Sequence, residues 1–246
     1  DPAVALNAGR MPGALPDILV GDADALYMRH VRLSYDLTDP ITPNLLSWGL
    51  KSDTHLMAGS GFLDDTMFNR TTWRYGKRID RSQLLVVDGS QVFGLRVYSG
   101  ISWNCSVFNQ GDGYVLFRQN VSKAAPPVPP AARKEKMLNR IPFERYGWHA
   151  RVPVRVSAMV LTGSRQGAAK RRLFVAGLPD VIDPADPLAT YEGRKGAELL
   201  TLSAETGGKV SALHLPAIPV WDGLIASQNR LYLTLRNGTV MCLKGI

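Results

Sequence analysis

Acidic residues that could bind a metal gather in one segment of the chain, residues 177–194. Asp180, Asp183, Asp186 and Glu192 lie close together there, and clustered carboxylate oxygens suit Ca²⁺. The segment lacks the regularly alternating ligands of an EF-hand loop, and two of the aspartates precede prolines, a pairing that also forms ordinary turns. Ion binding by these four residues and simple turn formation both stay open.

The other residues with catalytic potential are scattered. Asp64 and Asp65 could share acid/base work in a cleft, but neighbours on a strand point to opposite faces, which favours turn capping. The four histidines are isolated, without HExxH spacing, and no GxSxG elbow is present. We therefore predict no catalytic residue.

Three aromatic residues are the candidates for a sugar- or peptide-binding surface. Trp73 lies two positions before Tyr75, and Trp103 follows later in the chain. Aromatic rings offer large apolar area and, for Trp and Tyr, a polar group at one end. Packing between sheets is the alternative role for each of them.

The two cysteines, Cys105 and Cys242, lie far apart in sequence. Neither a CxxC pair nor a haem-attachment motif exists, which excludes a metal centre built on sulfur. A disulfide between them and two buried free thiols are both compatible with the sequence.

Composition limits the class of protein and its partners. The 246 residues are 45% hydrophobic, include 23 Gly and 16 Pro, and carry a formal charge of +8. This charge favours acidic partners, proteins or polymers, yet the short basic runs at 133–136 and 170–172 accompany no nucleic-acid-binding motif and are interpreted as solvated loops. No apolar stretch is long enough for a transmembrane helix.

Short apolar runs bounded by turn residues predict an all-β protein. A hairpin is expected around Gly21–Asp24, and another around Asp88-Gly89 between the runs at 84–87 and 92–98. Residues 124–133 form a proline-rich connection that cannot pair in a sheet, and residues 177–194 form a long inserted loop with acids and prolines.

A repeat emerges once this insertion is removed. Arg172-Leu173-Phe174-Val175-Ala176 and Arg230-Leu231-Tyr232-Leu233-Thr234 start 58 residues apart. The next strand follows after 22 residues in the first copy and after 5 in the second; removing this difference of 17 leaves a period of 41. A four-stranded propeller blade needs about 40–45 residues, so the repeat predicts a β-propeller of four-stranded antiparallel blades.

Residues 196–210, with the turn Ala204-Glu205-Thr206-Gly207-Gly208, resemble the pyrroloquinoline-quinone-like (PQQ-like) repeat. Within that turn, the threonine hydroxyl is expected to cap and glycine to take a positive φ. The wider run 152–243 is similar to PQQ-like propeller domains in large secreted or envelope proteins of planctomycete-type bacteria. This resemblance implies that residues 1–246 form one such domain or most of one, within a larger polypeptide or complex.

The functional expectation is a non-catalytic propeller in the periplasm, in the cell envelope or outside the cell, which holds a protein or polymer partner. A working quinoprotein would be expected to carry adjacent cysteines over the quinone, so we expect no bound quinone and leave Ca²⁺ as the cofactor to test. Two alternatives stay open: a fragment of a quinoprotein-type or hydrolytic enzyme, and a structural subunit that completes a propeller with another chain.

Overall fold

The computed structural model describes residues 18–28, 31–38, 55–58, 73–75, 82–96, 114–121, 146–163 and 170–244. These residues form strands and turns and no helix, so the all-β prediction is confirmed. No helix in these ranges could therefore span a membrane. Trp103, Cys105, the Asp64-Asp65 pair and the proline-rich connection 124–133 lie outside the described residues.

The chain divides into two compact units, residues 1–83 and 84–246. In the first unit, β1, β2 and β3 form an antiparallel meander, and β4 pairs with β5. The hairpin predicted around Gly21–Asp24 is present, because the Asp22 carboxylate accepts hydrogen bonds from the backbone of Asp24 and Ala25. The strands are β1 (Leu19–Gly21), β2 (Leu26–Met28), β3 (Val31–Leu33), β4 (Leu56–Ala58) and β5 (Trp73–Tyr75).

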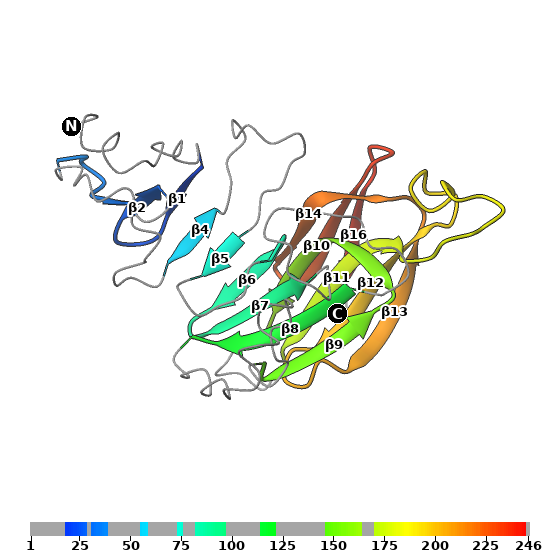
Figure 1. Cartoon of the computed structure of the whole chain (residues 1–246), viewed down its shortest axis with the longest axis horizontal. Coiled ribbons are helices and arrows are strands. Elements are labelled where there is room, and N and C mark those ends of the chain that lie inside the picture. Colours follow the sequence, from blue (N-terminus) through cyan, green and yellow to red (C-terminus); the bar gives the residue numbers. More distant parts are fainter. Residues whose placement is uncertain are drawn as a thin grey trace, which may run out of the picture. The chain divides into compact units, whose positions relative to one another are not determined.

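The second unit contains three successive antiparallel meanders. Each strand in them pairs with its neighbour in sequence, in the orders β6-β7-β8-β9, β10-β11-β12-β13 and β14-β15-β16. We call these the first, central and last sheets; Figure 1 shows them in colours from cyan to red. Their strands are β6 (Leu85–Asp88), β7 (Gln91–Arg96), β8 (Tyr114–Asn120), β9 (Trp148–Val152), β10 (Val154–Thr162), β11 (Arg172–Pro179), β12 (Ala197–Ser203), β13 (Lys209–Leu215), β14 (Pro219–Ser227), β15 (Arg230–Leu235) and β16 (Val240–Lys244).

The repeat found in the sequence corresponds to a position in the meander. Its two copies lie in β11 and β15, each the second strand of its sheet, and the following strands β12 and β16 are each the third. The initial strands of the sheets also contact one another, since β10 lies against β6 and β14 lies against β10. Among the described residues the sheets do not close into a ring, so the propeller stays a prediction.

Two hydrophobic clusters hold the three sheets together. One fills the space between the first and central sheets, and the other lies between the central and last sheets. Strand β11 contributes side chains to both clusters, because Leu173 and Val175 lie in the first cluster whereas Phe174 and Ala176 lie in the second. Successive side chains on a strand point to opposite faces, which explains why β11 is a continuous apolar run. Each such buried leucine or phenylalanine contributes about 1.5–3 kcal/mol.

Candidate interaction surface

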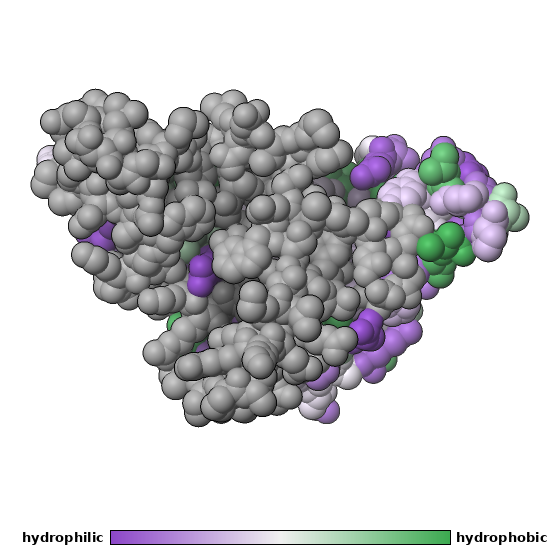
Figure 2. Space-filling model, in the orientation of Figure 1, coloured by the Kyte–Doolittle hydropathy of each residue, from purple (hydrophilic) through white to green (hydrophobic). Residues whose placement is uncertain are grey.

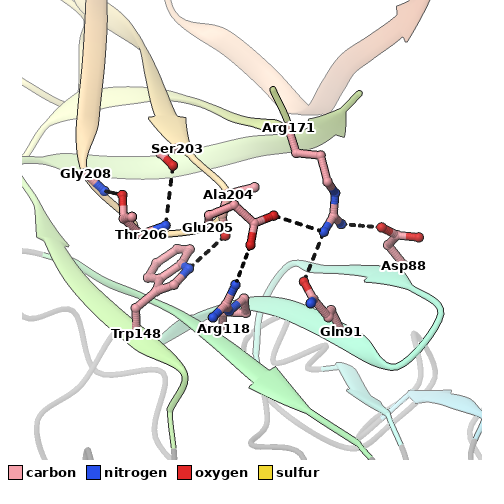
Figure 3. Close-up of polar contacts among 10 residues, drawn as sticks. All are labelled: Asp88, Gln91, Arg118, Trp148, Arg171, Ser203, Ala204, Glu205, Thr206 and Gly208. Carbon is pink, nitrogen blue, oxygen red and sulfur yellow. Dashed lines mark hydrogen bonds and ion pairs between the residues drawn. The ribbon is translucent and has the colours of Figure 1, made fainter. Parts of the chain in front are cut away.

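The turn that carries the PQQ-like signature is attached to the neighbouring sheet by Trp148 of β9. The Trp148 Nε1–H donates to the carbonyl oxygen of Ala204 at 2.8 Å (Figure 3), and its ring lies against Gly207. Gly207 has φ of +73°, and a Cβ there would lie 2.5 Å from the Trp148 Cε3 atom. The Thr206 hydroxyl accepts the backbone N–H of Gly208. The predicted roles of threonine and glycine in this turn are therefore confirmed.

Arg171 ties the same two sheets together with charge. Its guanidinium donates to the Gln91 side chain at 3.1 Å, pairs with Asp88, and lies 3.5 Å from the Glu205 carboxylate (Figure 3). Glu205 also pairs with Arg118 of β8 at 3.1 Å. Two arginines thus face two carboxylates, an arrangement that fixes the sheets relative to each other.

The expectation that Arg171 lies in a solvated loop was wrong. Its side chain is 6% exposed, because it reaches back across the first sheet and covers the ring of Phe93 with its guanidinium, 5.7 Å from the ring centre. A basic run in a sequence does not show whether its side chains are buried. Arginine can bury its long apolar stem while its guanidinium pairs with a carboxylate. The local sequence pattern around Arg171 cannot identify Asp88 as its partner, because Asp88 lies 83 residues away.

The acidic segment separates into two parts in the structure. Asp180, at the end of β11, has a side chain that is 1% exposed and pairs with the buried Arg155 at 3.1 Å. The Arg155 guanidinium also lies over the ring of Tyr191, 4.5 Å from its centre. Asp180 therefore anchors the base of the loop to β10.

The remaining three acids lie on the projecting part of the loop. Asp183 pairs with Lys195 at 2.6 Å, Asp186 binds Arg194 through both carboxylate oxygens, and Glu192 contacts the same arginine. The hydrogen bond from Lys195 is the main cause that lowers the pKa of Asp183. No group of three or more His, Cys, Asp or Glu residues in the described ranges is placed to hold a metal ion. The calcium site stays a prediction.

The same loop also exposes aliphatic side chains. In Figure 1 it projects in yellow between β11 and β12, and Figure 2 shows hydrophobic and hydrophilic residues side by side on it. Val181, Ile182 and Leu188 are exposed there, while the Thr190 hydroxyl donates to the Val181 carbonyl and braces the loop from within. The loop is a folded projection held by its own ion pairs.

Of the predicted aromatic surface, the structure describes two members. Trp73 and Tyr75 lie two positions apart on β5 and are both half-buried. They face the same side of that short strand because side chains alternate along it. Strand β5 belongs to the first unit, whereas the three sheets belong to the second.

The last sheet exposes several apolar side chains on one face, which sequence reasoning did not identify. Leu231, Leu233 and Leu235 of β15 point into the cluster beneath, so the residues between them point outward. The strand register places Ile225 beside Tyr232 and Tyr232 beside Cys242, and Thr234 beside Val240. We call these five residues the outer face.

The exposure of the outer face contrasts with the central sheet. Ile225 and Val240 are each 62% exposed, and Cys242 is an exposed free thiol. Strands β11 and β12 of the central sheet are covered on both faces, one by each hydrophobic cluster, whereas β13 is largely exposed. Exposed apolar side chains that lie together on one face of a sheet are typical of interaction surfaces, so we take the outer face as the candidate.

Strand β14 of this sheet contains an irregular segment. The register between β14 and β15 shifts between Pro219 and Leu224, and Asp222 in this segment has φ of +54°. Partial burial raises the pKa of the Asp222 carboxyl, and the neighbouring Trp221 is exposed. Such bulges redirect side chains and bend the strand.

Comparison with known proteins does not assign the chain to a family. No protein-family model, curated protein or solved structure matches it. The geometry described above therefore carries the functional argument alone.

Proposed function

We propose that this chain is a non-catalytic, PQQ-like β-propeller module that holds a protein partner within a larger secreted, periplasmic or envelope assembly. Three consecutive meanders whose initial strands contact one another support the propeller. A 41-residue period matches the size of one blade. The signature turn at residues 203–208 lies where one sheet meets the next, and Trp148 attaches it there.

The outer face is the observation that carries the binding role. Each interface between sheets in this unit is made by an apolar sheet face that the neighbouring sheet covers. The last sheet has a second face of the same kind, with two aliphatic residues more than half exposed. Covering apolar surface stabilises a complex by about 25 cal/mol per Å² before the costs of association.

The non-catalytic part of the proposal is supported by the chemistry of the polar groups. Asp88 and Glu205 are engaged by Arg171, and the acids of the projecting loop by Lys195 and Arg194. Carboxylates held by permanent cations suit structural attachment better than proton transfer.

A second candidate function is a structural subunit that completes a propeller with another chain. It is favoured by the strand count of the last sheet, which has three strands where the first and central sheets have four. Among the described residues β16 is its final strand. An edge strand presents unpaired backbone N–H and C=O groups that can accept another strand.

Two measurements on material from the source cells test the proposal. Quinone and metal analysis should find no stoichiometric quinone; finding it would support the enzyme alternative instead. The alkylation rate of Cys242, followed by peptide mass spectrometry, should be several-fold slower in a native extract than in the dilute purified protein. Equal rates would show that nothing covers the outer face in the cell.

A further inference from the structure

The last sheet ends on a strand whose backbone can accept another strand. The Leu235 N–H donates to the Thr239 carbonyl at 2.9 Å, which closes the β15–β16 hairpin with a hydrogen-bonded pair. Hydrogen-bonded and non-hydrogen-bonded pairs alternate in an antiparallel ladder, and the register of β16 continues from this pair. The N–H and C=O groups of Val240, Cys242 and Lys244 therefore point away from β15. No strand of the described residues pairs with that edge of β16.

Apolar side chains surround the place that a further strand would take. Met241 and Leu243 of β16 are half-buried and pack against the second cluster. Leu213 of β13 pairs with Leu199, a member of that cluster, and so lies on the same side of the central sheet, yet Leu213 is 43% exposed. The central and last sheets begin at strands in contact, β10 and β14. A fourth strand of the last sheet therefore corresponds to β13 and lies next to these three side chains.

We infer that the partner adds an extended segment to the free edge of β16, as a fourth strand of the last sheet. The inference rests on the proposed function and names what the partner presents. The first and central sheets have four strands each, so the interface at the second cluster is one strand short on the side of the last sheet. In strand addition, backbone hydrogen bonds supply affinity and alternate side chains supply specificity.

The two faces of β16 define the sequence of the added segment. Its side chains beside Met241 and Leu243 are apolar, because they extend the second cluster. On the outer face, Arg230 and Lys244 are exposed and lie side by side in the register of the sheet. Opposite charges on neighbouring strands attract, so the segment carries an acidic residue beside Lys244. The segment therefore alternates apolar with polar residues, and one of the polar residues is acidic.

A synthetic peptide tests strand addition on the full chain. The probe alternates valine with polar residues, one of which is a glutamate placed to lie beside Lys244. At about ten times its Kd it should slow amide hydrogen exchange at Val240, Cys242 and Lys244 by about tenfold, and leave the amides of β13 unchanged. Lysine in place of the glutamate should weaken binding about 2- to 5-fold, and Lys244→Glu should remove this preference.

Two N-methylated peptides and two variants at one position provide matched controls. Methylation of the peptide amides that face β16 should abolish binding, whereas methylation of the opposite edge should not. Cys242→Pro removes an outward N–H from β16, and an edge strand accepts proline there, so circular dichroism should show a folded chain that no longer binds the probe. Cys242→Ser keeps the N–H and should bind as the wild type does. Equal binding of the two methylated peptides, or binding by folded Cys242→Pro, would overturn the inference.

Exchange in the purified chain without peptide distinguishes the occupants of the edge. The amides of Val240, Cys242 and Lys244 should exchange freely. Protection at every concentration would assign the edge to another segment of the same chain, and protection that rises with concentration would assign it to a second copy; either result overturns the inference.

A wild-type chain that does not bind the probe would also overturn it. If Cys242 is nevertheless protected from alkylation in the native extract, the partner covers the outer face without adding a strand, and the proposed function stands. If Cys242 is unprotected as well, both proposals fail.

Discussion

Replacing Gly207 by alanine should destabilise the second unit far more than the same change at an ordinary turn glycine. Gly207 has φ of +73°, a conformation that costs an L-residue about 1–2 kcal/mol. The new Cβ would also lie 2.5 Å from Cε3 and 2.8 Å from Cδ2 of Trp148. Forcing extra atoms into a packed contact costs about 1–3 kcal/mol. The expected loss in the free energy of unfolding is therefore about 2–5 kcal/mol.

Gly238→Ala separates the two contributions. Gly238 has φ of +84°, yet a Cβ there meets no atom within 4 Å. That variant should lose only the backbone term, about 1–2 kcal/mol. Urea unfolding followed by circular dichroism measures both variants. The difference between them, about 1–3 kcal/mol, reports the contact with Trp148.

The same glycine substitution in a Trp148→Ala background completes a double-mutant cycle between residues 148 and 207. With the indole ring removed, Gly207→Ala should cost no more than Gly238→Ala does in the wild type. Equal costs for Gly207→Ala and Gly238→Ala in the wild-type chain would refute the reasoning, because the ring would then not rest on the glycine.

Three further changes probe the polar groups. Asp180→Ala removes the carboxylate that pairs with the buried Arg155 guanidinium, so the free energy of unfolding should fall by about 3–5 kcal/mol. The exposed Asp186→Ala is the control and should lower it by only about 0–1 kcal/mol. Similar losses for the two variants would contradict the importance of the buried pair. Arg171→Met should lower the free energy of unfolding by about 1–3 kcal/mol in the same assay. A change within about 0.5 kcal/mol, as is usual for surface substitutions, would show that the contacts of Arg171 between the two sheets contribute little to stability. Because burial raises the pKa of Asp222 above the ordinary 3.8, the folded state holds this proton more tightly than the unfolded state, and stability falls as pH rises from about 3.8 through the folded pKa. Asp222→Asn should therefore gain stability relative to the wild type over that rise, and a difference that is constant with pH would contradict the shift.

The strands were predictable because turn residues and apolar runs are local signals. Asp88-Gly89 marks the hairpin of β6 and β7, and the unbroken apolar run of β11 reflects burial on both faces. The repeat was predictable once the inserted loop was subtracted, since the second strands β11 and β15 share a sequence pattern.

The outer face was not predictable in the same way. Alternation along β15 shows that Leu231 and Leu233 share one face and Tyr232 and Thr234 the other, but only the tertiary arrangement shows which sheet covers each face. Proximity in sequence likewise does not show which acids are buried, because Asp180 turns inward to Arg155 while Asp183 and Asp186 lie on the loop. Side-chain burial depends on partners that are distant in sequence.

The central claim is that the last sheet has an outer face built to be covered by another protein. The alkylation rate of Cys242 in a native extract, compared with that in the dilute purified chain, tests it most directly. The account predicts strong protection in the extract that disappears on purification and dilution. Full reactivity of Cys242 in both samples would contradict it.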